Sequence, residues 1–325
     1  MALPVEGYKL EGISPRAYQH PADRAATAAL QRVPYLEDVV RKLISLGYER
    51  ALRAASLGAS VRLGQDQLPH VWVLHREVFN ALDLEPVPDL YLGAFPVANA
   101  ATIGHDKPVV ILNSELYRIL DDPARRAVLA HEAAHVHSGH VLYQTATLIL
   151  LRIGAGARLP LLAGLPLFAV QLALLEWFRA AELSCDRGAA IVTRDPLAVC
   201  RALMVIAAGE AADQLSLDAF IAQAMDYDEA GTGLERLSRM LQDMNVTHPM
   251  PVRRVRELLK WVREGEYDRI IGGEYVRRGE EPPLRDEADA AQEHYSQRIS
   301  DAFSAAGSSV SEVGQQLGDW LKRQR

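Results

Sequence analysis

This chain has little cysteine: its 325 residues include only Cys185 and Cys200. Two cysteines cannot build the disulfide framework of a small secreted domain, so the sequence favours a reducing compartment. A secretory signal is also missing, because residues 1–7 have no basic stretch followed by an apolar core. Together these absences predict a cytoplasmic location.

Positive charge is in deficit as well. The chain has 35 Lys and Arg residues against 42 Asp and Glu residues, a net charge of -7. Proteins that bind nucleic acid need a basic surface, so no nucleic-acid partner is expected. Hydrophobic residues make up 49% and charged residues 24% of the chain, a balance typical of a globular protein with a substantial core. No internal repeat or low-complexity tract is present.

No apolar run cleanly reaches the roughly 20 residues that a membrane-spanning helix needs. Residues 148–153 and 159–175 come nearest, and Arg152 and Gln171 interrupt them. The sequence therefore favours a buried helical hairpin over residues 148–175. Peripheral contact with a membrane through the same stretch is the alternative.

What the chain does contain is an H-E-x-x-H run at residues 131–135. A helix is predicted there, because Asp121 or Asp122 can cap its start and good helix formers follow. Residues i and i+4 of a helix share one face, which places His131 and His135 side by side. Such a pair predicts a zinc site. A surface helix with scattered histidines is the alternative for so short a pattern.

The chemistry explains the residue types. Two neutral imidazoles hold Zn²⁺ and leave a position for water, whose pKa the metal lowers to about 7. Glu132 follows the first imidazole, so it can take a proton from this water without binding the metal. A third ligand is usually required, and Glu182 and Asp186 offer carboxylates at i and i+4 of another predicted helix. Glu182 is predicted to bind zinc and Asp186 to accept a hydrogen bond from His131. Alone, such a pair is more typical of a solvated helix face.

These motifs together resemble the M48 peptidases, the gluzincin family of HtpX and the CaaX prenyl proteases. The similarity covers roughly residues 15 to 260. The segments that carry it are His131 to His135 with Gly139-His140, Glu182 to Asp186, His248-Pro249 with Arg254, and, more weakly, Tyr18 to Pro21 with Asp23 and Ala98-Asn99-Ala100.

The resemblance implies zinc ligation by His131, His135 and Glu182, with one Zn²⁺ per chain, and catalysis by Glu132. It also implies that two further residues act near the metal. His248 would stabilise the oxyanion, with Arg254 as its support. In some family members the histidine that matches His248 instead closes the fourth zinc position, and the sequence leaves both roles open.

Substrate binding is expected at Asn99 and Ala100, which look like the edge strand along which a substrate would lie extended. Backbone pairing there would bind unfolded chains with little regard to their side chains. A turn into a core strand is the alternative for residues 99–103. Three residues near the motifs are given no role: His137 and His140 are expected to be structural, and Cys185 to be packed in the core.

The fold class implied is α+β and predominantly helical: a zincin-like domain with a small sheet ahead of the H-E-x-x-H helix. Residues 22–57 are expected to form two helices and residues 75–82 another. The expected short strands are residues 61–63, 71–73, 87–92 and 109–112. The expected segments are an N-terminal helical segment (1–65), the peptidase domain (66–275), and a charged linker with an amphipathic C-terminal helix (276–325).

Two functions follow from these residues. The first is a zinc-dependent endopeptidase of protein quality control, which hydrolyses unfolded or membrane-associated proteins. The second is a non-proteolytic zinc-binding module that holds client chains like a chaperone. All the catalytic residue types are present, which favours the first and makes a polypeptide substrate the expected partner. The oligomeric state is not predicted.

Overall fold

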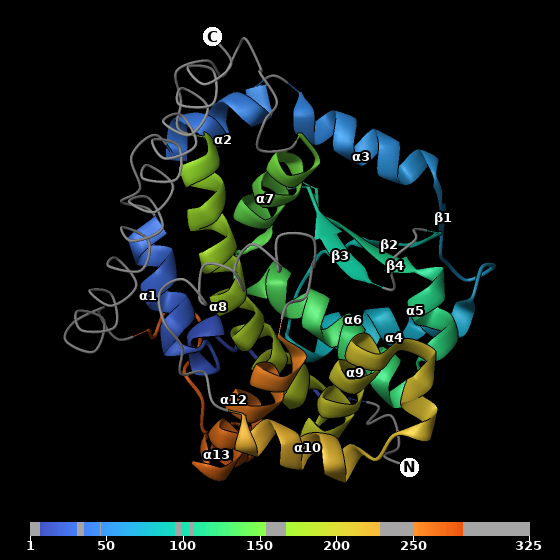
Figure 1. Ribbon diagram of the computed structural model, residues 1–325, viewed down its shortest axis with the longest axis vertical. Coiled ribbons are helices and arrows are strands. Elements are labelled where there is room, and N and C mark those ends of the chain that lie inside the picture. The colour runs from blue at the N-terminus through green and yellow to red at the C-terminus, as the bar shows by residue number, and fades with distance from the viewer. Residues whose placement is uncertain are drawn as a thin grey trace, which may run out of the picture.

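The computed structural model describes residues 7–30, 36–45, 47–94, 99–104, 107–153, 167–227 and 250–281. Most of this part of the chain is helical, with a four-stranded sheet on one side (Figure 1). The α+β class with a small sheet is therefore confirmed. His248 and residues 282–325 lie outside the described residues. The division into three segments stays a prediction.

The helices are η1 (Pro15–Ala17), α1 (Pro21–Leu30), α2 (Leu36–Ser45), α3 (Tyr48–Gly58), α4 (Pro69–Ala81), α5 (Ser114–Ile119), α6 (Asp122–His137), α7 (Val141–Ile153), α8 (Leu167–Thr193), α9 (Pro196–Ala208), η3 (Gly209–Gln214), α10 (Leu217–Asp226), α12 (Pro251–Arg263) and α13 (Glu266–Ile271). The strands are β1 (Ser60–Arg62), β2 (Asp89–Gly93), β3 (Ala100–Ile103) and β4 (Val109–Asn113).

The sheet has the order β1-β2-β4-β3, so β3 lies at one edge. The β2–β4 pair is parallel, whereas β1 and β3 run antiparallel to their neighbours. In β3, Ala100 stands opposite Leu112 and Thr102 opposite Val110. Side chains two apart on a strand share a face, and both Ala100 and Thr102 lie beside α6.

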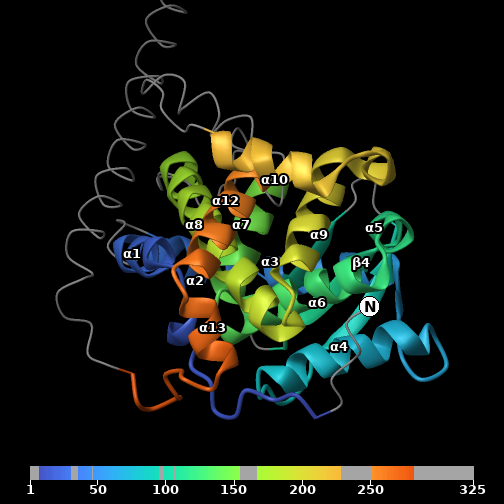
Figure 2. The same ribbon diagram turned by 90° about the horizontal axis from the view of Figure 1, so that it is seen from below.

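The H-E-x-x-H helix α6 begins as its sequence requires. The Asp121 side chain accepts a hydrogen bond of 2.9 Å from the Ala124 N–H, and Pro123 occupies the first turn. Helix α8 passes beside α6 at the centre of the molecule, and α12 lies between α8 and α9 (Figures 1 and 2). Gly188 permits the close approach of α8, because a Cβ there would stand 2.5 Å from the Cβ of Ala134. This approach brings both motif carboxylates to α6.

Two sequence predictions are wrong. Residues 71–73 are not a strand, because α4 already starts at Pro69 and Val71 lies fully buried on the helix. Residues 22–57 form three helices rather than two. Gly47, with a φ of 76°, precedes α3, and this left-handed conformation interrupts the expected second helix.

The apolar stretch from 148 to 175 is described in part. Its first residues belong to α7 and its last to α8, while residues 154–166 lie outside the described residues. Among the helices that the structure describes, none combines the length and the hydropathy needed to cross a membrane.

Candidate metal centre

Three predicted ligand side chains from α6 and α8 converge in a buried centre. The Oε1 atom of Glu182 lies 3.1 Å from Nε2 of His135, and its Oε2 atom lies 3.5 Å from Nε2 of His131. The two imidazole rings are 4.9 Å apart and nearly perpendicular. His135 and Glu182 are fully buried, and His131 is 6% exposed. Each imidazole therefore turns Nε2 toward the same carboxylate.

This donor set fits a zinc ion. Ligand atoms at about 2.0 to 2.1 Å from a tetrahedral Zn²⁺ stand about 3.3 Å from one another. The carboxylate-to-imidazole separations of 3.1 and 3.5 Å bracket that value. Two imidazole nitrogens and one carboxylate are also a usual ligand set of catalytic zinc sites, so the residue types and the spacing agree.

Cys185 offers a competing third ligand. One donor atom of Cys185 lies within 4.8 Å of donor atoms of His131 and His135. Its sulfur is 3.6 Å from Nδ1 of His140, which is itself 3.3 Å from Nδ1 of His135. The thiol therefore lies beside His140, on the Nδ1 side of the His135 ring and away from its Nε2 atom. Burial and the neighbouring carboxylates raise the pKa of the Cys185 thiol well above its usual range. Each oxygen of Glu182 faces one of the two Nε2 atoms, so the geometry favours Glu182 over Cys185 as the third ligand.

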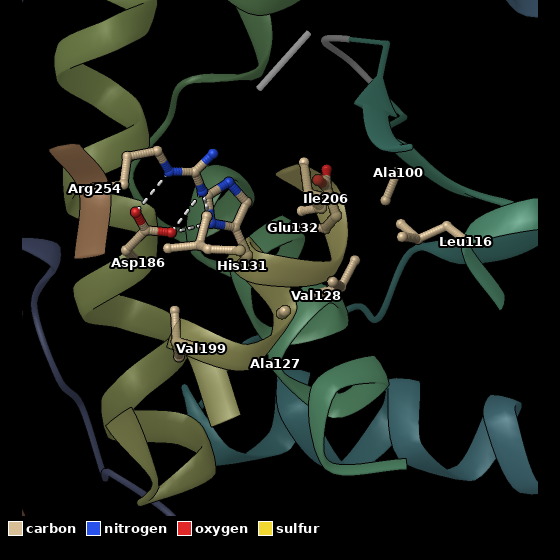
Figure 3. A pocket seen from close by; sticks show the side chains of 12 residues that line it. Ala100, Leu116, Ala127, Val128, His131, Glu132, Asp186, Val199, Ile206 and Arg254 are labelled. Carbon is tan, nitrogen blue, oxygen red and sulfur yellow. Dashed lines mark hydrogen bonds and ion pairs between the residues drawn. The ribbon is translucent and has the colours of Figure 1, made fainter. Parts of the chain in front are cut away.

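Asp186 and Arg254 hold the far side of His131 (Figure 3). Asp186 Oδ1 lies 3.1 Å from Nδ1 of His131. The Arg254 guanidinium donates to both oxygens of Asp186, at 2.6 and 2.7 Å, and its Nη1 lies 2.8 Å from Glu182 Oε2. Arg254 is thus bidentate on one carboxylate and paired with the other. This geometry locks both carboxylates in place.

The electrostatics of the centre favour a cation. Burial by itself lowers the pKa of His131, but the Glu182 charge and the Asp186 hydrogen bond outweigh it and raise this pKa to about 9. Burial tends to raise the pKa of Asp186, yet Arg254 holds it below its usual range. The Asp186 carboxylate therefore stays ionised, and the raised pKa of His131 shows that its surroundings favour a positive charge.

Glu132 lies beside this centre and is held by a residue that the sequence did not single out. Its Oε2 accepts a hydrogen bond of 2.7 Å from Thr102 Oγ1, and both side chains are fully buried. Period-two alternation from Ala100 would have placed Thr102 on the same face of β3, but nothing in the sequence links it to Glu132.

A pocket opens next to Glu132 and His131 (Figure 3). The polar residues that line it are His131, Glu132, Asp186 and Arg254, and its apolar lining is Ala100, Leu116, Ala127, Val128, Val199, Ala202, Leu203 and Ile206. Ala100, predicted to bind substrate, therefore adjoins the predicted base. Asn99 precedes β3, and its carbonyl accepts a hydrogen bond of 2.8 Å from Asn113 N–H. The edge strand, the base and the donor set thus meet at one place.

The two other motif histidines differ in their contacts. His137 lies 2.8 Å from the Tyr18 hydroxyl and 3.0 Å from the Ile13 carbonyl, which fits the structural role expected of it. Burial lowers its pKa to about 4. His140 instead reaches a buried carboxylate, Asp23, at 3.0 Å. In the sequence, Asp23 is only a weaker element of the family resemblance.

The family model and two relatives that match this chain are all peptidases by name. The sequence model of peptidase family M48 matches residues 75–262. The chain is 35% identical over 259 residues to the plastoglobule-localized metallopeptidase 48 of Arabidopsis thaliana, which covers 78% of this chain and 74% of the relative. It is 28% identical over 229 residues to a protease HtpX homologue of Burkholderia multivorans, which covers 63% of this chain and 78% of the relative. No solved structure matches the chain.

Proposed function

We propose, since the chain belongs to the metallopeptidase family M48, that it is a zinc-dependent endopeptidase acting on unfolded or membrane-associated polypeptides. The observation that carries this proposal is the donor set of the buried centre. Two imidazole Nε2 atoms face one carboxylate at the separations that a tetrahedral zinc ion requires.

In this proposal His131, His135 and Glu182 hold one Zn²⁺. When bound, this ion would supply a Lewis acid that polarises the scissile carbonyl and lowers the pKa of water. Glu132 would take a proton from the attacking water and pass it to the leaving amine nitrogen. Thr102 would keep the carboxylate of Glu132 in one orientation while it does so.

The remaining predicted residues surround these. Asn99 and Ala100 would bind the substrate as an extended strand along β3. Arg254 was predicted to support His248, and its contacts join it to Glu182 and Asp186. We therefore assign Arg254 to holding these two carboxylates. For His248, outside the described residues, the role in oxyanion stabilisation stays a prediction.

Metal removal is the first test. Dialysis against 1,10-phenanthroline is expected to abolish casein hydrolysis, and one equivalent of Zn²⁺ per chain is expected to restore it, because the proposed chemistry depends on the ion. Zinc content is measured alongside by mass spectrometry of the metal. His131→Ala should lower that content, whereas substitution of the exposed His70 by Ala should not. Full cleavage by the zinc-free protein would contradict the proposal.

For location we propose the cytoplasm, with peripheral contact to a lipid surface. The support for the lipid contact is the name of the Arabidopsis relative, which places that protein at plastoglobules. Residues 148–175 are the stretch proposed to make the contact, through side chains other than those of Ile149, Leu150, Val170 and Leu174, which are buried in the core. The purified protein is expected to float with liposomes in a density gradient. Recovery of all the protein from the bottom fraction would remove the lipid contact from the proposal.

A further inference from the structure

The two histidines of the H-E-x-x-H motif have different hydrogen-bond partners at Nδ1. Nδ1 of His131 faces a carboxylate directly, that of Asp186 at 3.1 Å. Nδ1 of His135 faces another imidazole nitrogen instead, Nδ1 of His140, at 3.3 Å. His140 in turn places Nε2 3.0 Å from Oδ2 of Asp23. All of these side chains are buried, so solvent does not take the place of any partner.

The turn after α6 brings His140 back beside His135. The N–H of His140 donates to the His135 carbonyl at 3.0 Å, and the N–H of Gly139 donates to the Val136 carbonyl at 3.2 Å. These two bonds form a Schellman motif, with Ser138 as the C-cap. Gly139 has a φ of 71°, which a glycine adopts without steric cost. The backbone itself therefore fixes the contact between the two rings.

Asp23 is built into the protein as an ionised acceptor. Its Oδ2 receives hydrogen bonds from Ser184 Oγ at 2.6 Å and Gln19 Nε2 at 3.0 Å, and its Oδ1 receives one from Thr27 Oγ1 at 3.3 Å. Burial tends to raise the pKa of Asp23, but His140 and the hydrogen bonds from Ser184 and Gln19 outweigh it and lower the pKa to about 2. An ionised carboxylate only accepts, so the Nε2 atom of His140 is the donor in their contact.

The position of the proton on the His140 ring determines which nitrogen of His135 is protonated. A neutral His140 with its proton on Nε2 has a lone pair on Nδ1. The contact of 3.3 Å between the two Nδ1 atoms then needs a proton from His135. The Cys185 thiol, whose sulfur lies 3.6 Å from the same Nδ1 atom of His140, is also placed to donate to this lone pair. With its proton on Nδ1, His135 carries its lone pair on Nε2, the atom that faces Glu182.

We propose that Asp23 and His140 form a positioning relay that holds the proton of His135 on Nδ1 and so presents its Nε2 lone pair for metal binding. This inference rests on the proposed role of His135 as a ligand. The relay is the counterpart of Asp186 behind His131, with one imidazole inserted between the carboxylate and the ligand. Neither residue lines the pocket beside Glu132.

The test compares two variants around the same carboxylate. Asp23→Asn keeps the shape of the side chain but removes the charge that holds the His140 proton on Nε2. Loss of such a partner behind a ligand typically weakens metal binding by about 10- to 100-fold, so the zinc dissociation constant is expected to rise about 10-fold or more. Ser184→Ala is the control, because it removes a hydrogen bond to Asp23, together with one from the His20 N–H, but leaves the contacts of His140 with Asp23 and His135. Its zinc dissociation constant should equal that of the wild type.

Zinc affinity is measured by competition with a fluorescent chelator, and the thermal stability of each zinc-free variant is measured beside it. A purely structural role would make the two variants lose stability with no selective loss of zinc affinity. Nitrogen-15 spectra of the histidine rings in zinc-loaded wild type give a readout that needs no variant. The relay requires the His140 proton on Nε2.

Equal zinc affinity in wild type and Asp23→Asn would overturn the relay, and so would a His140 proton on Nδ1. If Asp23→Asn does not fold, the spectra of the wild type decide the matter. Neither readout depends on hydrolysis. A chain that binds zinc with the expected histidine protonation but cleaves no polypeptide would contradict the proposed function and leave the relay standing.

Discussion

Glu132→Gln is expected to lower casein hydrolysis by at least about 100-fold without changing the zinc content. A positioned general base contributes about 10²- to 10⁴-fold to such a reaction, and an amide in its place cannot take a proton. Glutamine has nearly the same shape and can still accept the hydrogen bond from Thr102, so the buried structure should persist. Turnover and bound zinc are measured on the same preparation.

Thr102→Val is the variant with which the activity of Glu132→Gln is compared. It removes the donor to Glu132 but keeps the size of the side chain and the base itself. Activity is expected to fall less than in Glu132→Gln, because the carboxylate is misplaced rather than lost. If Glu132→Gln still cleaves casein at the wild-type rate with zinc bound, Glu132 is not the base. An unchanged rate in Thr102→Val would show that the contact of 2.7 Å does not orient it.

The residues that sequence reasoning placed correctly in space are those whose relation is local. His131 and His135 share a face of α6, and Glu182 and Asp186 share a face of α8, because both pairs are four residues apart on a helix. Helical periodicity is enough to predict that each pair points one way. That the two faces meet follows from the family resemblance and not from the pattern alone.

The residues that contact the motif side chains from other elements could not be predicted, because only tertiary packing brings them to the motif. Asp23 precedes His140 by 117 residues, and Thr102 precedes Glu132 by 30. Neither has a spacing that indicates a partner. Local preference also misled at residues 71–73, where two β-branched valines favour a strand. A helix start at Pro69 and burial of Val71 overrode that preference.

Arg254→Met is expected to destabilise the zinc-free protein by about 3 to 5 kcal/mol, because it leaves buried carboxylates without their cation. The Arg254 side chain is 4% exposed and pairs with both Glu182 and Asp186. The two carboxylates outweigh the effect of burial on this guanidinium and raise its pKa, so Arg254 is charged throughout the range of any assay. Denaturant unfolding of the zinc-free protein measures the loss.

The control is Arg269→Met, which removes two ion pairs on the surface, with Glu266 at 2.9 Å and with Glu274 at 3.7 Å. The Arg269 side chain is 60% exposed, and exposed pairs contribute about 0 to 1 kcal/mol. Losses of similar size in the two variants would show that the buried contacts of Arg254 carry no special weight.

Zinc binding and a second substitution distinguish how much each of the two carboxylates contributes to the loss of stability in Arg254→Met. Bound zinc would supply positive charge to Glu182, so the loss in Arg254→Met should be smaller in the zinc-saturated protein than in the zinc-free one. The Asp186 carboxylate would still lack the Arg254 charge there and would keep only its contact with His131. Arg254→Met combined with Asp186→Leu should therefore regain part of the stability, because a buried ion pair replaced by apolar groups costs less than one broken by removing a single partner. A double variant less stable than Arg254→Met would mean that packing around Asp186, and not its charge, dominates this part of the centre.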